Sequence, residues 1–392
     1  MKKISANKIL FFAVLMGTVI MATYANSVTM LYGGLELLIA GFCYLFLLLR
    51  WRKTDPWLLL FALVLTGFSL VGGLRTGNIK SVILLSISLI LPLAVSVLHL
   101  DNQENDKTFQ WAFLIGFALV FLQKNFQVLG ELNSNSIGFW SYMCISVGFV
   151  WYACRKKKIL PMVLLLIGFM FSRQTESRNV AIVTALATIL LLLPKKWYKN
   201  KNFFRTIYLL TLVYTIFAAA IMEWGFETPW ISDILTDYTE QYSDKTWTMA
   251  MRIAFLKEVK IFISNMSIFH KFFGNGVLVG HGHNMFYQSI LTYGYLGTAL
   301  LYAFYIRIFE MARKLIATHE DKIALGCTIA LLGCFMLNGA DVFLIGIEAC
   351  TIIPQVLMGI IIFRYRTMMQ TQTQLTEGEM TRGPAETNQN LG

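Results

Sequence analysis

The chain has 392 residues, of which 56% are hydrophobic and only 14% are charged, and its formal net charge is +11. A typical soluble protein carries roughly 25% charged residues, so this composition excludes a soluble globular enzyme, a disordered chain and a secreted disulfide-rich domain. The apolar segments are long and do not alternate with polar residues, which excludes an outer-membrane β-barrel. The positive charge does not require nucleic acid, because Lys and Arg collect in the cytoplasmic loops of membrane proteins.

Apolar runs recur along the whole chain. A transmembrane helix needs about 20 mostly apolar residues. We therefore predict an all-α polytopic membrane protein with about twelve transmembrane helices, or about ten if residues 159–193 form a re-entrant hairpin. The runs cover residues 9–24, 28–49, 57–74, 81–99, 109–123, 136–153, 159–171, 179–193, 206–224, 286–306, 323–337 and 346–363. The first run could also be a signal peptide, but we favour an uncleaved helix because the second run follows at once.

The basic residues divide unequally between the two sides that these runs define. With a cytoplasmic N-terminus, most of the 33 lysines and arginines fall on the cytoplasmic side, as the positive-inside rule requires. Both termini are then cytoplasmic. We divide the chain into a bundle of about nine spans (1–224), a large extracytoplasmic loop (225–285), about three further spans (286–366) and a disordered, polar cytoplasmic tail (367–392).

The large loop contains one predicted helix, at about residues 246–264. Its apolar stripe consists of Trp247, Met251, Phe255, Val259 and Phe262, which is the spacing of an amphipathic helix. Arg252 lies off this stripe. It belongs either to the basic face of an interfacial helix or to a site for a phosphorylated lipid substrate.

Arginines on the outer side are informative because the positive-inside rule works against them. Arg173 and Arg178 both lie between two short apolar runs, and Arg75 is a further outer arginine. Ser177 is a plausible N-cap, which would put Arg178 in the first helical turn, where the helix dipole disfavours a cation. A bound phosphate would remove this conflict. Contact with lipid headgroups, or an ion pair with Glu176, is the alternative explanation.

His281 and His283 lie in a glycine-rich segment directly before an apolar run. A His-x-His pair is a weak metal signal when no third ligand accompanies it at a matching spacing. The chain also has no Asp-x-Asp, Walker or Rossmann motif, so we predict neither a metal nor a cofactor. His283 is a candidate general base because imidazole titrates near neutrality. A structural histidine beside Asn284 is the alternative.

Several short motifs occur in a particular order. They are Ser172-Arg173 (or Ser177-Arg178), Arg252, Gly274-Asn275-Gly276, His283-Asn284 and Tyr293-Gly294-Tyr295-Leu296-Gly297. In these motifs, over residues 172–305, and in its overall topology the chain resembles the O-antigen and capsular polysaccharide polymerase (Wzy) and O-antigen ligase superfamily. The resemblance implies a glycosyltransferase of the bacterial plasma membrane that contributes to polysaccharide or capsule biosynthesis in the cell envelope. Such an enzyme moves glycan from undecaprenyl pyrophosphate to an acceptor hydroxyl at the outer face.

The resemblance also implies roles for individual residues. The acceptor oxygen attacks the anomeric carbon and the lipid pyrophosphate leaves, so without a metal its negative charge must be stabilised by fixed cations. We assign catalysis to Arg252 and His283, with Glu176 as the second candidate base. Further candidates for binding the pyrophosphate or the substrate are Arg75, Arg173, Arg178, His281, Asn284 and Glu176.

Three functions compete on these observations. The first is a repeat-unit polymerase acting on an undecaprenyl-pyrophosphate-linked oligosaccharide, with membrane lipids, a chain-length regulator and a flippase as partners and no nucleic acid. The second is a ligase that moves finished glycan onto another acceptor. The third is a lipid-linked glycan transporter or flippase, but two six-helix halves would often be joined by a long cytoplasmic connection, whereas the sixth run is followed by the short segment 155–158.

Overall fold

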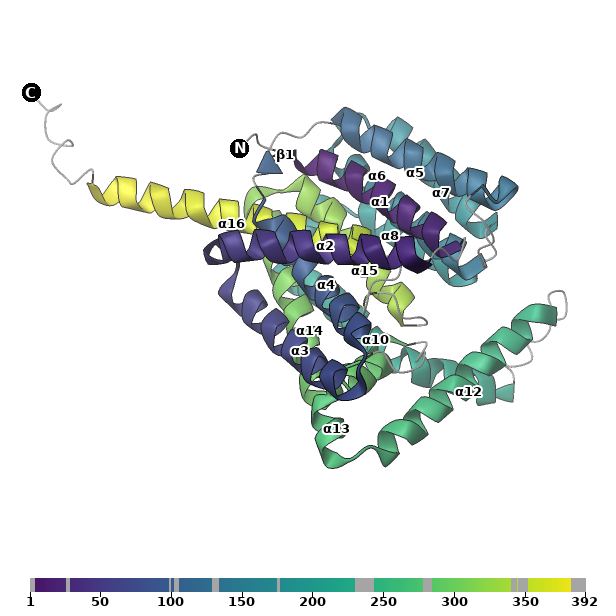
Figure 1. The fold of residues 1–392 in the computed structure, drawn as a ribbon. Coiled ribbons are helices and arrows are strands. Elements are labelled where there is room, and N and C mark those ends of the chain that lie inside the picture. Colours follow the sequence, from purple (N-terminus) through teal and green to yellow (C-terminus); the bar gives the residue numbers. More distant parts are fainter. Residues whose placement is uncertain are drawn as a thin grey trace, which may run out of the picture.

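The structure is a computed structural model, and it describes residues 4–25, 29–98, 100–101, 106–128, 134–174, 177–229, 243–277, 284–339, 344 and 352–381. These residues form a helical bundle (Figure 1). The helices are α1 (Ala6–Ala25), α2 (Thr29–Arg50), α3 (Pro56–Thr76), α4 (Ile79–Ser96), α5 (Asp106–Phe126), α6 (Ser134–Cys154), α7 (Ile159–Gln174), α8 (Arg178–Leu192), α9 (Lys195–Lys199), α10 (Lys201–Glu227), α12 (Ser243–Asn265), α13 (Ile268–Phe273), α14 (Met285–His319), α15 (Lys322–Asn338) and α16 (Ile352–Thr381). A 3₁₀ turn, η1 (Trp51–Lys53), follows α2, and two short strands, β1 (Ile4–Ser5) and β2 (Leu100–Asp101), pair in parallel.

Within the described part of the chain, 8 helices are long and apolar enough to cross a membrane. They are Gly34–Lys53, Pro56–Thr76, Ile79–Ser96, Lys107–Phe126, Ser136–Cys154, Lys201–Gly225, Met285–His319 and Ile352–Gln374. Shorter apolar helices are Lys8–Ile20, Ile159–Ser172, Asn179–Leu192 and Lys322–Asn338. The two groups together occupy the positions of all the predicted apolar runs. The apolar helices therefore indicate an all-α, multi-pass membrane protein, while the number of crossings stays a prediction.

Local sequence explains where individual helices begin and end, as α3 illustrates. The side chain of Asp55 caps its N-terminus by accepting a hydrogen bond from the Leu58 backbone N–H at 3.0 Å, and Pro56 occupies its first turn, where no backbone donor is lost. At the other end, Gly77 adopts a left-handed conformation (φ 70°), and Asn78 then caps α4. This glycine-asparagine pair reverses the chain directly into the next apolar helix.

Two central helices, α6 and α15, pack closely because glycine removes the side chain at their contacts. A Cβ on Gly326 would lie 2.5 Å from the Val150 Cα, and one on Gly333 would lie 1.7 Å from the Tyr142 hydroxyl. That hydroxyl donates to the carbonyl oxygen of Ala330 at 3.0 Å. Close approach at small residues is how helices associate in lipid, where the hydrophobic effect between helices is weak.

One end of the bundle is held together by ion pairs, and we call it the basic end. They are Arg307–Asp55 (2.8 Å), Arg205–Glu310 (2.6 Å), Arg313–Glu310 (2.8 Å), Lys199–Glu320 and Arg364–Asp321. Every one of these residues belongs to a segment that the positive-inside pattern assigns to the same side of the membrane. The structure thus gathers residues that are far apart in the sequence at a single end of the bundle.

The C-terminal part of the chain differs from the expectation. Helix α16 continues to Thr381 and projects beyond the bundle (Figure 1), so the predicted disorder from residue 367 is wrong up to that point; residues 382–392 lie outside the described residues. The hydroxyls of Thr367 and Thr371 donate to the carbonyl oxygens one turn earlier, both at 3.1 Å. The tail residues continue a helix that has already formed, so they do not bear the free-energy cost of starting a new one. The polar composition of the tail does not show that such a helix precedes it.

Candidate functional site

The end of the bundle opposite the basic end is built from α12, α13 and the ends of α3, α10 and α14; we call it the α13 end. Helix α3 begins at the basic end with Asp55 and is 21 residues long, so its last turn lies about 30 Å away. Lys257 of α12 pairs with Glu227 of α10 at 3.2 Å, and Lys260 pairs with Glu223. In Figure 1, α12 and α13 lie together on one side of the bundle.

The turn after α13 is bonded to a break in α14. The backbone N–H groups of Asn275 and Gly276 donate to the carbonyl oxygens of Leu291 (2.9 Å) and Thr292 (2.8 Å). These carbonyls are available because α14 has a non-helical residue at Gly294, where the regular i to i+4 ladder is interrupted. Two motifs of the family resemblance, the Gly-x-Gly element and the Tyr293-Gly294 element, therefore contact each other.

Glycine is required on both sides of this contact. Gly294 has φ 68° and ψ −177°, and Gly274 has φ 72° and ψ −172°, a backbone region that is essentially restricted to glycine. A Cβ on Gly294 would lie 2.3 Å from the Phe272 carbonyl oxygen, and a Cβ on Gly274 would lie 2.3 Å from the Thr292 carbonyl oxygen. The two segments can meet only as bare backbone.

A third glycine brings α3 into the same contact. A Cβ on Gly72 would lie 2.0 Å from the Asn275 carbonyl oxygen, and one on Gly276 would lie 2.5 Å from the Phe68 carbonyl oxygen. The rings of Phe68 and Phe273 also meet edge to face at 5.4 Å. We call Gly72, residues 274–276 and Gly294 the glycine junction. It fixes the position of α13 relative to the last turns of α3.

Arg75, predicted as a substrate-binding residue, lies one turn beyond this junction. Its Nη1 contacts Nε2 of His270 at 2.6 Å, although the two residues are 195 positions apart. A guanidinium can only donate, so Nε2 accepts, the ring is neutral, and Nδ1 carries the proton and donates to the Ser267 hydroxyl at 2.7 Å. Arg75 also lies in the last turn of α3, where the helix dipole favours a cation.

Asn284, the second predicted binding residue that the structure describes in full, joins three helices. Its side-chain oxygen accepts from the backbone N–H groups of Phe286 (2.9 Å) and Tyr287 (3.2 Å), which caps α14. Its amide donates to the carbonyl oxygens of Thr215 (2.9 Å) and Gly339 (2.8 Å). The side chain is fully buried, and these four bonds use both amide hydrogens. Asn284 therefore anchors the beginning of α14 to α10 and to the residue that ends α15.

Arg252, the predicted catalytic arginine, lies on α12 and is partly buried. The face of α12 that packs on protein carries Ile253, Leu256 and Ile263, which are 5%, 0% and 6% exposed, whereas Phe262 of the predicted apolar stripe is 47% exposed. Val259 of the predicted stripe does pack against the cluster that contains Ile263, so the stripe and the buried face overlap only in part. Hydrophobic spacing identifies an apolar face, but it does not distinguish packing on protein from exposure to lipid.

The segment with two arginines follows the expected helix boundary. Helix α8 begins at Arg178 with Ser177 as its N-cap, but the Ser177 side chain makes no capping bond. Instead it packs against α6, since a Cβ on Gly138 would lie 2.5 Å from the Ser177 Cβ. Arg173 lies near the C-terminus of α7. The side chains of both arginines lie outside the described residues, as do Glu176, His281 and His283.

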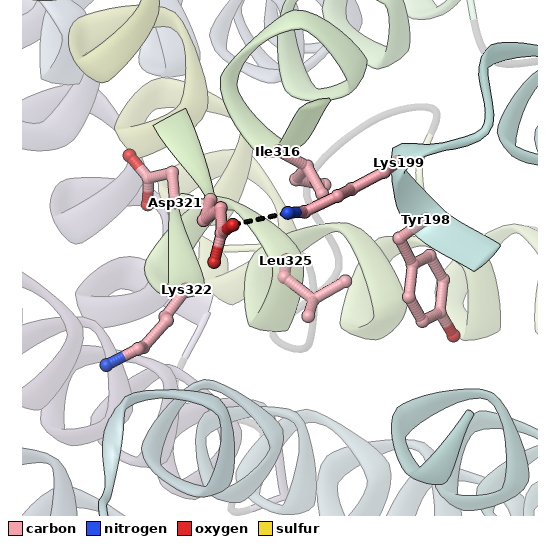
Figure 2. Close-up of a pocket in the computed structure, with 7 residues that line it drawn as sticks. Tyr198, Lys199, Ile316, Asp321, Lys322 and Leu325 are labelled. Atoms are coloured by element: carbon pink, nitrogen blue, oxygen red, sulfur yellow. Dashed lines mark hydrogen bonds and ion pairs between the residues drawn. The ribbon is translucent and has the colours of Figure 1, made fainter. Parts of the chain in front are cut away.

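Hollows at the described surface include these two. The smaller has a volume of about 20 Å³ and lies at the basic end, between α9 and the α14–α15 turn. Lys199 is hydrogen-bonded to Glu320 there, and Figure 2 shows Lys199 among the residues that line the hollow. This volume accommodates about one water molecule, so it cannot hold a lipid-linked sugar. The larger hollow, of about 510 Å³, is an apolar groove bordered by α1, α2, α4 and α16.

The chain matches no protein-family profile, and no curated protein is significantly similar to it in sequence. Among the residues that the structure describes, no three His, Cys, Asp or Glu side chains lie close enough together to hold a metal ion.

Sequence reasoning did not find His270 or the role of Gly72. His270 stands alone in an apolar stretch, and its only local signal is the Ser267 N-cap three residues earlier. Gly72 is one of two adjacent glycines in an apolar helix, which resembles an ordinary helix contact. Both residues act through partners that are distant in the sequence.

Proposed function

We propose that the protein is a polysaccharide repeat-unit polymerase, a metal-independent membrane glycosyltransferase that uses an undecaprenyl-pyrophosphate-linked oligosaccharide. The proposal places the reaction at the α13 end, at the outer face of a bacterial plasma membrane, and places both termini in the cytoplasm. The segregation of the paired basic segments to the opposite end supports this orientation, because basic loops are retained inside.

In the proposed reaction the acceptor sugar hydroxyl attacks the anomeric carbon of the growing chain. A new glycosidic C–O bond forms, the bond to the lipid pyrophosphate breaks, and the pyrophosphate leaves with the bonding electrons. His283 takes the hydroxyl proton. Arg252, with Arg75, Arg173 and Arg178, stabilises the charge that develops on the leaving group. The pyrophosphate bond already carries the energy for transfer, so no nucleotide is consumed.

One observation carries the proposal furthest: the contact of Arg75 with His270 beside the glycine junction. It brings an arginine from the first third of the chain to the segment that also holds the Gly-x-Gly element. A neutral imidazole leaves the guanidinium charge uncancelled by this contact, and a site for a dianionic leaving group needs such charge. Asn284 supports the proposal as well, because it directly follows His283 in the chain and its own side chain is held in place by four hydrogen bonds.

The test is an assay of purified protein with a lipid-linked oligosaccharide. Wild-type protein should produce longer lipid-linked chains, also in the presence of EDTA. Arg252→Ala should lower the rate by about 10²–10³-fold, the usual cost of losing one charge-stabilising donor, and His283→Ala should abolish extension.

Lys257→Ala is the matched control for Arg252→Ala. It removes a cation from the same helix, but this cation is exposed and pairs with Glu227, so its rate should equal that of the wild type. Equal rates for wild type and both site variants would overturn the site assignment. Transfer to a different acceptor without chain extension would identify a ligase, and movement of the intact lipid across the bilayer without new bonds would identify a flippase.

A further inference from the structure

Helix α13 carries an exposed apolar face. Ile268, Phe269 and Phe272 lie on this short helix and are 77%, 55% and 54% exposed. A group of large apolar side chains this open to its surroundings faces either lipid or a partner protein. The position of α13 beside two candidate membrane spans, α3 and α14, decides between them.

Helix α13 lies beside the last turns of α3 (Figure 1). The 21 residues of α3 span about 30 Å, which is about the thickness of the hydrocarbon core. Arg75, in the last turn of α3, contacts His270. Phe68, which lies about 12 Å before the end of α3, contacts Phe273. Helix α13 therefore runs inward along α3, from the end of this span toward its middle.

The surface of α3 at the same depth is also apolar and open. Leu70, Val71 and Leu74 are 47%, 60% and 66% exposed, and they belong to a helix long and apolar enough to cross a membrane. Within a bilayer, lipid surrounds such a span on every side that protein does not cover. The exposed face of α13 extends this lipid-facing surface, because the two helices are in contact at this level.

Helix α14 folds back on itself, which gives a second measure of depth. The rings of Phe286 and Tyr302 are 6.3 Å apart, whereas their separation along a straight helix would be about 24 Å. The non-helical Gly294 is the corner. Thr215, near the middle of α10, accepts from Asn284 at 2.9 Å, and its hydroxyl lies 2.5 Å from that of Tyr302. The part of α14 before the corner therefore starts deep in the bundle and rises to the glycine junction.

The backbone of the glycine junction meets the condition for a place inside the membrane. Non-helical backbone is tolerated at membrane depth only where protein or water satisfies its polar groups. The N–H of Gly274 donates to the carbonyl oxygen of His270 at 2.8 Å, and the N–H groups of Asn275 and Gly276 donate to carbonyl oxygens of α14. All three donors of this turn are thus satisfied by protein.

We propose that α13 and the glycine junction form a re-entrant element that enters the leaflet at the α13 end, and that Ile268, Phe269 and Phe272 dock onto the acyl chains of that leaflet. Part of the segment predicted as an extracytoplasmic loop (225–285) then lies within the membrane. The contact between Arg75 and His270 is held at the level of the lipid headgroups, where a cation is tolerated. This placement is independent of the proposed transferase reaction, because an inactive protein would have the same depth.

The experiment measures the depth of α13 by electron paramagnetic resonance of the full chain in proteoliposomes of phosphatidylethanolamine and phosphatidylglycerol. Ile268→Cys and Phe272→Cys each carry a nitroxide label. Its accessibility to O₂, which concentrates in hydrocarbon, is compared with its accessibility to Ni(II)-EDDA, which stays in water. The cysteines that the structure describes are buried, and wild-type protein treated in parallel measures their background. Gel filtration checks the fold, and Phe269→Cys replaces a variant that is not monodisperse.

Two reference positions calibrate the result. Leu74→Cys, on the exposed face of α3, represents lipid, and Lys257→Cys, at the exposed pair with Glu227, represents water. The ratio of O₂ to Ni(II)-EDDA accessibility at Phe272 should match that at Leu74 and exceed that at Lys257. The ratio at Ile268 should be intermediate, because Ile268 lies nearer the membrane surface.

Three results would overturn the proposal. A ratio at Phe272 equal to that at Lys257 places the exposed face of α13 in water. Low accessibility of Phe272 to both reagents shows that a partner protein, or a second copy of this chain, covers the face. Equal ratios at Ile268 and Phe272 show that α13 lies flat on the membrane and does not enter it.

Discussion

The two ends of the bundle hold their arginines in different ways. At the basic end, Arg307 contacts Asp55, and Glu310 accepts from both Arg205 and Arg313. At the α13 end, Arg75 contacts a neutral imidazole, and the backbone is fixed by glycines. Ion pairs with carboxylates cancel charge and join helices, whereas the Arg75 contact orients a cation and preserves its charge. Ion pairs of the first kind are typical of residues that stabilise the fold, whereas an oriented arginine that keeps its charge is typical of a site that binds an anion.

The largest effect should come from the glycine junction. Gly294→Ala forces a Cβ into a backbone region restricted to glycine and against the Phe272 carbonyl oxygen. We expect a loss of about 3 kcal/mol or more in the free energy of unfolding, measured by denaturant titration in detergent. Gly67→Ala is the control, because a Cβ there would meet nothing within 4 Å. If both variants unfold alike, the junction is not a determinant of stability.

An intermediate effect is expected at the basic end. Glu310→Gln removes the carboxylate that holds Arg205 and Arg313 together, and it also weakens the bond from the Tyr208 hydroxyl (2.6 Å). We expect a loss of about 1–2 kcal/mol, since hydrogen bonds to a charged group contribute strongly but this one is partly exposed to water. Thermal unfolding should detect it. Glu227→Gln, at an exposed pair of the α13 end, should show no measurable change, and the opposite ranking would contradict the distinction between the ends.

The smallest effect on stability should come from the pair that distinguishes the α13 end. His270→Ala removes the acceptor for Arg75 at a partly exposed position, so the melting temperature should fall by less than about 2 °C. His270→Gln retains an acceptor and should match the wild type. In the extension assay, by contrast, Arg75→Ala should slow the reaction without unfolding the protein. A large drop in melting temperature for His270→Ala would show that the contact between Arg75 and His270 mainly stabilises the fold.

The parts of the fold that were predictable rest on local sequence. Apolar runs locate the helices because bilayer thickness sets their length, and Asp55-Pro56 and Gly77-Asn78 mark the ends of α3 through capping chemistry. Ser177 was identified as an N-cap from its position, yet its side chain packs against α6 instead of bonding to the helix. Helix boundaries follow from neighbours in the chain, but side-chain partners do not.

The parts of the site that were not predictable depend on distant contacts. Arg75 was selected because it opposes the positive-inside rule, but nothing in its neighbourhood points to His270. The buried face of α12 was predictable only in part, because both faces carry apolar residues: Val259 of the predicted stripe packs on α14, but so does Ile263, which lies outside the stripe. Motif order identified the Gly-x-Gly and Tyr293-Gly294 elements separately, and their mutual contact emerged only in three dimensions.

The glycine junction has a consequence for how this sequence can diverge. Gly72, Gly274 and Gly294 come from three separate segments, and each faces backbone atoms of another. A side chain introduced at any one of them would therefore meet backbone, and replacing neighbouring side chains by smaller ones would not make room for it. Descendants of this chain can exchange bilayer-facing leucines freely, but they must inherit these three positions as a set or rebuild the approach of α13 to α14 altogether.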